Sequence, residues 1–296
     1  MINELAKADG GINLKNWNIR RAQIIVTYDC NMNCPFCINY KLGKKRKGFI
    51  KVSDVVYFLQ YLKYVEKLED AIIVFLGGEP TLFPIDSLKE ISDLAHSMGY
   101  KTEFYTNGTL KEKILELDGY IDFITFSNYG KGILPFDNMD YLYKFEKSTI
   151  TISKLITKQY FKTFEDFDKF VDLANELPFN YDFSTIQETT PDFSLYQPEW
   201  IEEKLLPLCE NQDVRGNVGA ALYKGRLIKL PHVHLQRKED ICTLKLYPNG
   251  NLSTTWKNDN NEIEYKKIIN KLLEKNLIFR GNFYEKKYLF CRTYGN

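Results

Sequence analysis

Residues 23–37 read Gln-Ile-Ile-Val-Thr-Tyr-Asp-Cys30-Asn-Met-Asn-Cys34-Pro-Phe-Cys37, an apolar run that ends in three closely spaced cysteines. Thiolates are the usual ligands of iron-sulfur clusters, and a [4Fe–4S] cluster normally takes four of them. A compact set of three cysteines is therefore expected to hold three irons and to leave the fourth iron open to another ligand.

The same three cysteines are also compatible with a zinc site or with simple buried thiols. A structural zinc site needs a fourth Cys or His, yet the nearest histidine is His96 and no second Cys-x-x-Cys pair follows. Disulfide bonds fit poorly, because a chain of 296 residues with 44% hydrophobic residues can form its own core.

Two further motifs follow the cysteines. Residues 71–80 read Ala-Ile-Ile-Val-Phe-Leu-Gly-Gly-Glu-Pro, a buried strand that ends in a glycine turn where the backbone can approach a ligand closely. Residues 102–110 read Thr-Glu-Phe-Tyr-Thr-Asn-Gly-Thr-Leu, a second strand that runs into a turn. Both motifs thus lie at the carboxyl end of a predicted strand.

In this order, the three motifs resemble those of the radical S-adenosylmethionine (SAM) superfamily. Its members carry CxxxCxxC, usually with an aromatic residue before the third cysteine, then a GGEP-type turn and often a TNG turn. The resemblance covers residues 22–190. It implies a [4Fe–4S] cluster that reductively cleaves SAM to a 5'-deoxyadenosyl radical, which abstracts a hydrogen atom from the substrate. The cofactor supplies this reactivity, and the protein positions it.

The resemblance also implies a role for each matching residue. The metal ligands are expected to be Cys30, Cys34 and Cys37. The expected SAM contacts are Phe36 near the adenine, Gly77, Gly78 and Glu79 at the methionine amino group, Pro80 fixing the turn, Ser127 at the carboxylate or ribose, and Thr106 and Asn107 beside them. Lys154 could approach the SAM carboxylate, although we expect it to be exposed.

Composition favours an intracellular enzyme. The 40 Lys and Arg residues against 39 Asp and Glu give a formal net charge of +1, so no global field recruits nucleic acid or an anionic membrane. No apolar run approaches the roughly 20 residues that span a bilayer, and charges interrupt the N-terminus where a signal peptide needs an apolar core. An oxygen-sensitive cluster also needs a reducing compartment, so we expect a cytoplasmic protein.

Strand-like and helix-like segments alternate along the first two thirds of the chain. The predicted strands are residues 23–28, 71–76, 102–106, 123–127, 149–156 and 181–186. The first predicted helix begins at a capping Ser53, and four further helices are predicted at residues 86–98, 110–117, 137–145 and 163–177. This alternation predicts an α/β fold, a partial (β/α)6 TIM-type barrel, with its chemistry at the carboxyl ends of the strands. We expect a lead-in over residues 1–20, this core over 21–190 and an extension over 191–296.

The extension is predicted to be a small α+β unit. Residues 242–256 predict a β-hairpin around an Asn-Gly turn, and residues 263–275 predict an amphipathic helix. This layout resembles a degenerate SPASM/twitch extension, which holds an auxiliary iron-sulfur cluster, but Thr255 and Tyr294 stand where cysteines are expected. Cys209, Cys242 and Cys291 then have three readings: ligands of a second cluster, hydrogen-atom donors, or buried structural thiols.

The substrate remains open between a ribosomal peptide and a sugar-like or nucleotide-like metabolite. Without a second cluster to accept an electron, redox-neutral outcomes such as epimerisation gain weight over net oxidation. The alternative is a non-catalytic iron-sulfur or zinc protein that retains the fold. The basic run 41–47 is either a solvated loop or a docking site for a flavodoxin-type or ferredoxin-type electron donor. His232 and His234 alternate on a predicted strand without a third metal ligand nearby.

Overall fold

The computed structural model describes residues 18–37, 48–69, 71–130, 132–134, 140–185, 196–215, 218–230, 241–253 and 265–274. Six strands form its first part: β1 (Asn18–Thr27), β2 (Ile72–Gly77), β3 (Lys101–Thr106), β4 (Phe123–Asn128), β5 (Thr149–Ile156) and β6 (Asn180–Thr185). Five more follow: β7 (Glu210–Arg215), β8 (Val218–Tyr223), β9 (Arg226–Leu230), β10 (Ile241–Leu246) and β11 (Leu252–Ser253).

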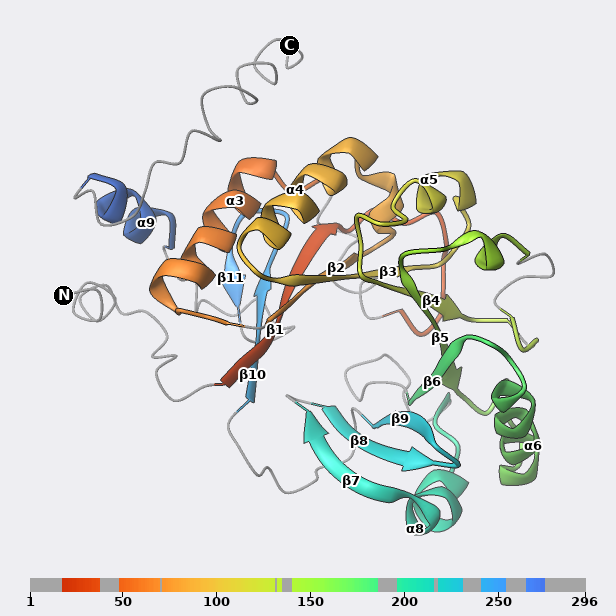
Figure 1. The fold of residues 1–296 in the computed structure, drawn as a ribbon. Coiled ribbons are helices and arrows are strands. Elements are labelled where there is room, and N and C mark those ends of the chain that lie inside the picture. The colour runs from red at the N-terminus through yellow and green to blue at the C-terminus, as the bar shows by residue number, and fades with distance from the viewer. Residues whose placement is uncertain are drawn as a thin grey trace.

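The described strands form one sheet in the order β11-β10-β1-β2-β3-β4-β5-β6-β9-β8-β7. From β1 to β6, each strand pairs in parallel with the next one along the chain. The sheet curves strongly without closing, and β1–β3 and β7–β9 lie on opposite arms of the curve (Figure 1). The predicted partial barrel of six parallel strands is confirmed.

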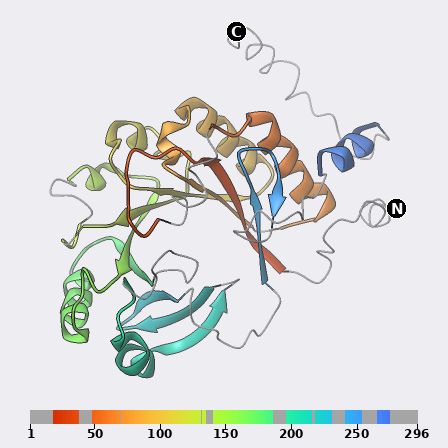
Figure 2. The same ribbon diagram turned by 180° about the vertical axis from the view of Figure 1, so that it is seen from behind.

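Helices cover the outer face of this curve in both views (Figure 1, Figure 2). They are α3 (Val52–Gln60), α4 (Ile85–Ser97), α5 (Lys111–Leu115) and α6 (Phe164–Asn175). Alternate strand residues point toward them: on β4, Ile124 and Phe126 are fully buried in the main core. The apolar faces of the helices therefore pack on the outer face of the sheet. The other face of each strand lines the inside of the curve.

Two helix predictions need correction. The first helix begins at Val52, after Lys51, and no side chain caps it, so Ser53 lies within its first turn and is not its cap. Within the predicted helix 137–145, the described part is a short 3-10 helix, Asp140–Lys144. By contrast, α6 begins with a reciprocal capping box between Thr163 and Asp166, as its sequence favours.

The C-terminal strands do not form a separate sheet. The predicted hairpin is present as antiparallel β10 and β11, with Gly250 in the left-handed region at φ +82°, but β10 also extends the sheet beside β1. At the other edge, β9 pairs in parallel with β6, and β8 and β7 continue antiparallel. The extension therefore lengthens both edges of the core sheet.

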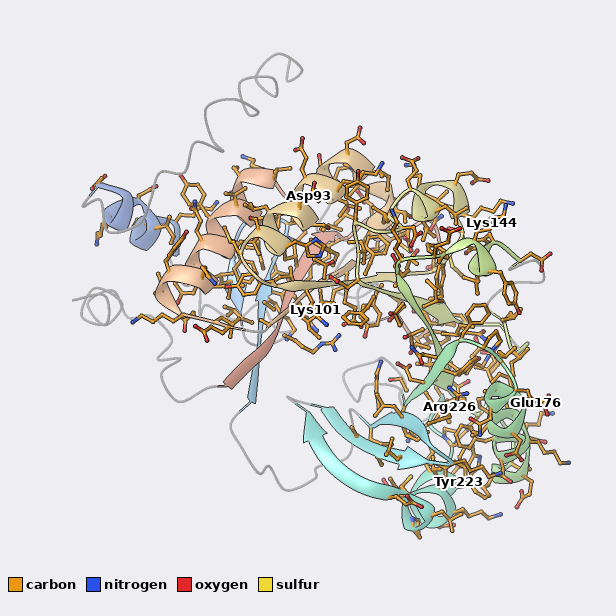
Figure 3. The ribbon with its side chains drawn as sticks, in the orientation of Figure 1. Asp93, Lys101, Lys144, Glu176, Tyr223 and Arg226 are labelled. Carbon is orange, nitrogen blue, oxygen red and sulfur yellow. The ribbon has the colours of Figure 1, made fainter. Side chains whose placement is uncertain are left out.

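Helical elements accompany these strands. The short α8 (Leu206–Leu208) precedes β7, and α9 (Tyr265–Glu274), within the predicted amphipathic helix, packs on α3. Tyr223 and Arg226, labelled in Figure 3, hold the β8–β9 turn against α6: the Tyr223 hydroxyl donates to Asp168 Oδ1 at 2.6 Å, and Arg226 Nη2 donates to the Ala174 carbonyl at 3.0 Å. None of the described helices is long and apolar enough to cross a membrane.

Candidate active site

The cysteine loop (residues 30–37) follows β1 directly. Cys30 is exposed, whereas Cys34 and Cys37 are half-buried. A tight turn closes the loop, because the Cys37 amide donates to the Cys34 carbonyl at 3.1 Å. The Met32 amide donates to Cys30 Sγ at 3.4 Å. All three thiols therefore lie at the carboxyl end of the first parallel strand, where the sequence predicts chemistry.

The glycine turn (residues 77–80) packs directly on the backbone that enters the cysteine loop. The Gly78 amide donates to the Thr27 carbonyl at 2.7 Å, and the Glu79 amide donates to the Asp29 carbonyl at 2.8 Å. A Cβ on Gly77 would lie 2.2 Å from the Thr27 carbonyl oxygen, and a Cβ on Gly78 would lie 2.0 Å from that of Asp29. Two glycines are required here because a backbone segment occupies the space of a side chain.

The Glu79 carboxylate joins the glycine turn to the Thr-Asn-Gly turn (residues 106–108). It is 1% exposed. Its Oε1 accepts from the amide and hydroxyl of Thr81 at 3.1 and 2.6 Å and from the Thr106 hydroxyl at 2.8 Å, and its Oε2 accepts from the Asn107 amide at 2.8 Å. The carboxylate is thus fully used inside the protein, and it fixes the second and third motifs to each other.

Asn107 completes the link back to the cysteines. Its side-chain amide donates to Asn31 Oδ1 at 2.8 Å and lies 3.9 Å from Cys30 Sγ. Its Oδ1 accepts from the Thr109 hydroxyl at 2.6 Å, and Asn31 donates to that hydroxyl at 2.7 Å. The three sequence motifs therefore form one hydrogen-bonded unit at the carboxyl ends of β1, β2 and β3.

Replacing Glu79 with Gln tests this unit. The amide nitrogen of Gln would face one of the four donors that now converge on the carboxylate, so at least one buried hydrogen bond to a charged acceptor is lost. We expect unfolding of the metal-free protein to become easier by about 3 kcal/mol. Urea denaturation measures this change, and Glu112→Gln, an exposed site on α5, is the matched control. Equal stability of the two variants would contradict the role given to Glu79.

Phe36 lies within the cysteine loop, and Tyr129 connects it to Ser127. Phe36 is buried and contacts the rings of Tyr129 and Tyr196, with centroid distances of 5.4 and 6.1 Å. Ser127 lies near the carboxyl end of β4, half-buried, and its side chain hydrogen-bonds to Tyr129. Ser127 is therefore connected through Tyr129 to Phe36 in the cysteine loop, as the predicted SAM contacts require.

The thiols fit an iron-sulfur cluster by their chemistry. In the part of the chain that the structure describes, no three His, Cys, Asp or Glu side chains are gathered into a ready metal site. Burial, and then the charges of Cys37 and Cys30, raise the pKa of Cys34 to about 11. A half-buried thiol such as Cys34 needs a nearby positive charge to become a thiolate, and a metal cluster would supply it. The N–H donors at Cys30 are of the kind that tunes a bound cluster.

Lys154 was expected to be exposed, and that expectation is wrong. Its side chain on β5 is fully buried. Its Nζ donates to the Gly130 carbonyl and to Asn128 Oδ1, and it lies 4.3 Å from the ring centre of Tyr160. Among the described residues no carboxylate pairs with it. Lys154 and Asn128 together hold the turn that follows β4, and of the two only Lys154 was considered from the sequence.

Burial lowers the pKa of Lys154 from 10.5 to about 8. Below about pH 8 both the folded and the unfolded chain carry the proton, whereas between about pH 8 and 10.5 only the unfolded chain does. Stability should therefore rise with pH across this window, by up to about 3 kcal/mol, relative to Lys154→Met. Urea denaturation of both metal-free proteins at several pH values measures this difference. A difference that does not vary with pH would refute it.

Of the other cysteines, Cys209 and Cys242 lie away from the cysteine loop. The backbone of Cys242 pairs with Ile19 at the start of β1, and Cys291 lies outside the described residues. Cys209 is half-buried just before β7, whose first residue pairs with Leu222 on β8 near the start of β9. Cys209 and Cys242 thus lie at opposite edges of the sheet and at the amino ends of the parallel strands. Residues 41–47, His232 and His234 also lie outside the described residues.

Comparison with known proteins shows which protein family this part of the chain resembles. Residues 24–127 match the model of the radical SAM superfamily. This match begins in β1, spans all three motifs and ends at Ser127, so it covers the hydrogen-bonded unit described above. The matched segment is about a third of the chain, and proteins of this superfamily use a [4Fe–4S] cluster and SAM.

Two curated relatives match a similar length of chain. A protein with the provisional name of glycyl-radical enzyme activating enzyme, from Methanocaldococcus jannaschii, is 36% identical over 98 residues, which are 33% of this chain and 38% of that protein. An S-adenosylmethionine-dependent nucleotide dehydratase from Flammeovirga pacifica is 35% identical over 107 residues, which cover 33% of this chain and 34% of the relative. The chain therefore matches little more than a third of the length of these relatives.

A solved structure, native anSMEcpe with bound AdoMet and Cp18Cys peptide, is similar with a TM-score of 0.44 at 16% identity. That similarity covers 57% of this chain and 52% of the solved one.

Proposed function

We propose that this chain is a radical SAM enzyme that binds a [4Fe–4S] cluster through Cys30, Cys34 and Cys37 and modifies a peptide or a sugar-like or nucleotide-like metabolite. When bound, the cluster supplies the electron that cleaves SAM to a 5'-deoxyadenosyl radical, and this radical abstracts a hydrogen atom from the substrate. The observation that carries the proposal is the convergence of the three motifs through Glu79 and Asn107.

The chain's own residues supply position and exclusion of water. The backbone of Gly77 and Gly78 would meet the methionine amino group, and the amides of Gly78 and Glu79 hold that backbone against the residues that enter the cysteine loop. Phe36 would lie near the adenine, and Ser127 would bind the carboxylate or ribose. The neighbouring rings of Tyr129 and Tyr196 shield this region, because a reactive intermediate must be kept from solvent and stray hydrogen donors.

Some of the substrates and reactions known in the superfamily are better supported for this chain than others. The two curated relatives carry the names of an activating enzyme and a nucleotide dehydratase, which support a protein or a nucleotide as substrate. Epimerisation with a cysteine as hydrogen donor is supported less, because Cys209 and Cys242 lie at the amino ends of the strands. A flavodoxin-type or ferredoxin-type protein is the proposed electron donor, and a cytoplasmic location suits such a reductant.

Anaerobic reconstitution with iron and sulfide tests the proposal. With dithionite and SAM, the reconstituted protein should form 5'-deoxyadenosine. An intact cluster that forms none would favour the alternative, a non-catalytic iron-sulfur protein with this fold. Iron analysis of the same sample distinguishes a single cluster, at about four irons per chain, from two clusters, at about eight.

A further inference from the structure

The inner face of the curved sheet is unusually polar. On β4, Thr125 and Ser127 alternate with the core residues Ile124 and Phe126, so they point to the inside of the curve. Ser127 pairs in register with Ser153 on β5, and Ser153 pairs with Asp182 on β6. Directly paired residues share a face, so these three side chains form a polar row across the sheet, called here the Ser-Ser-Asp row.

Ion pairs cross this inner face. Arg21 on β1 donates to Glu103 Oε2 on β3, and the Thr125 hydroxyl donates to Glu103 Oε1 at 3.4 Å. Lys229 on β9 donates to Asp182 Oδ2 at 2.6 Å, and the same ammonium lies 5.8 Å from the ring centre of Tyr105 on β3. Side chains from both arms of the curve therefore meet inside it.

One acceptor in this network has no partner among the described residues. Asp182 is 6% exposed, and while its Oδ2 binds Lys229, its Oδ1 is buried without a hydrogen bond. The Oε1 atom of Gln23 on β1 is also buried and unpartnered. An unsatisfied buried carboxylate oxygen is costly, and native structures retain few such groups. A bound molecule with hydrogen-bond donors would satisfy it.

The network remains open to solvent in part. The side chains of Arg21 and Lys229 are 40% and 25% exposed, whereas those of Glu103 and Asp182 are 10% and 9% exposed. The basic groups thus border the inner face, and the acidic groups lie deeper.

Asp182 lies in the same row as Ser127, so its unpartnered Oδ1 is near the predicted SAM contact. They are two strands apart in one row, and neighbouring strands are about 4.8 Å apart, so their backbones lie roughly 10 Å from each other. If SAM binds at Ser127, as the proposed function requires, a molecule held by Asp182 lies next to it.

We propose that Asp182 is the substrate-recognition residue, and that its Oδ1 accepts a hydrogen bond from a hydroxyl group of a small polyhydroxylated substrate, a sugar or nucleoside. A neutral donor fits better than an ammonium group, because Lys229 already neutralises Asp182 and Arg21 borders the same face. The serine hydroxyls of the Ser-Ser-Asp row can donate to and accept from such a molecule. This inference rests on the proposed function and narrows its substrate.

Calorimetric titration of the reconstituted wild-type protein in the presence of SAM tests the proposal. The probes are the common ribonucleosides, their 5'-triphosphates and UDP-glucose, with a short cysteine-containing peptide for comparison. At least one hydroxyl-bearing probe should bind. Asp182→Asn should weaken that binding at least about tenfold, because a hydrogen bond to a charged acceptor is lost.

Two further variants control the result. Asp172→Asn makes the same change at an exposed ion pair, where Asp172 Oδ1 lies 2.8 Å from Lys224 Nζ, and it should leave probe affinity unchanged. Ser153→Ala keeps the Asp182–Lys229 ion pair intact, so it remains informative if Asp182→Asn misfolds. It should weaken probe binding about threefold or more.

The outcomes separate this inference from the proposed function. If the wild type forms 5'-deoxyadenosine but binds only the peptide or no probe at all, the inference is overturned and the proposed function stands. Probe binding that is equal in wild type, Asp182→Asn and Ser153→Ala would also overturn the inference. Absence of 5'-deoxyadenosine with an intact cluster overturns the proposed function instead.

Discussion

Cys34→Ala should reduce 5'-deoxyadenosine formation to background and leave the reconstituted protein with little iron. Two thiolates on the cysteine loop do not replace the three that hold the cluster, and the structure describes no nearby Cys or His in a ready metal site that could substitute. The expected loss is the largest in this account, because every later step depends on SAM cleavage. Iron analysis and chromatography of the nucleoside product measure it.

Cys209→Ala is the matched control for that experiment. Cys209 is half-buried at the amino end of the strands, and burial raises its pKa to about 11, as expected for a packed structural thiol. A single cluster predicts that this variant keeps about four irons per chain. Loss of iron from Cys209→Ala but not from Cys34→Ala would contradict the assignment of the cluster ligands.

Gly78→Ala should damage the site without removing any ligand. The new Cβ would lie 2.0 Å from the Asp29 carbonyl oxygen and 2.6 Å from that of Tyr28, and both contacts are backbone atoms that cannot swing aside. The turn must shift, so the Gly78–Thr27 and Glu79–Asp29 hydrogen bonds break. We expect a loss of about 4 kcal/mol and a melting temperature about 10 °C lower, with weak cluster incorporation.

Gly132→Ala supplies the comparison for this steric argument. A Cβ there meets no atom closer than 3.6 Å, and the backbone does not lie in the left-handed region. Thermal unfolding of the two metal-free variants should therefore separate clearly. If Gly78→Ala melts within about 2 °C of Gly132→Ala, the close approach of the glycine turn to the cysteine loop is not a constraint.

The sequence predicts the first six strands because each is a short run of β-branched and aromatic residues bounded by turns. It also predicts that the motifs meet, since parallel strands bring their carboxyl ends to one edge. It does not predict how they are joined. The family resemblance predicts Glu79 at the methionine amino group, whereas the link from its carboxylate to Thr106 and Asn107 spans residues far apart in the chain.

Lys154 and Asp182 show why the rest escapes sequence patterns. Lysine is rarely buried, and the acceptors that allow the burial of Lys154 come from the last residue of the preceding strand and from the turn after it. The environment of Asp182 depends on its ion pair with Lys229. Lys229 lies on β9, which follows α8, β7 and β8 in the chain and pairs with β6. Local periodicity carries no information about which edge a later strand extends, so the inner face could not be assembled from the sequence.

We propose that the cysteine loop and the glycine turn form a single SAM-binding cluster site. Electron paramagnetic resonance of the reduced, reconstituted protein tests it most directly, with and without SAM. The cluster signal should change when SAM is added, and Cys34→Ala should show no such signal. Identical spectra of an intact cluster with and without saturating SAM would contradict it.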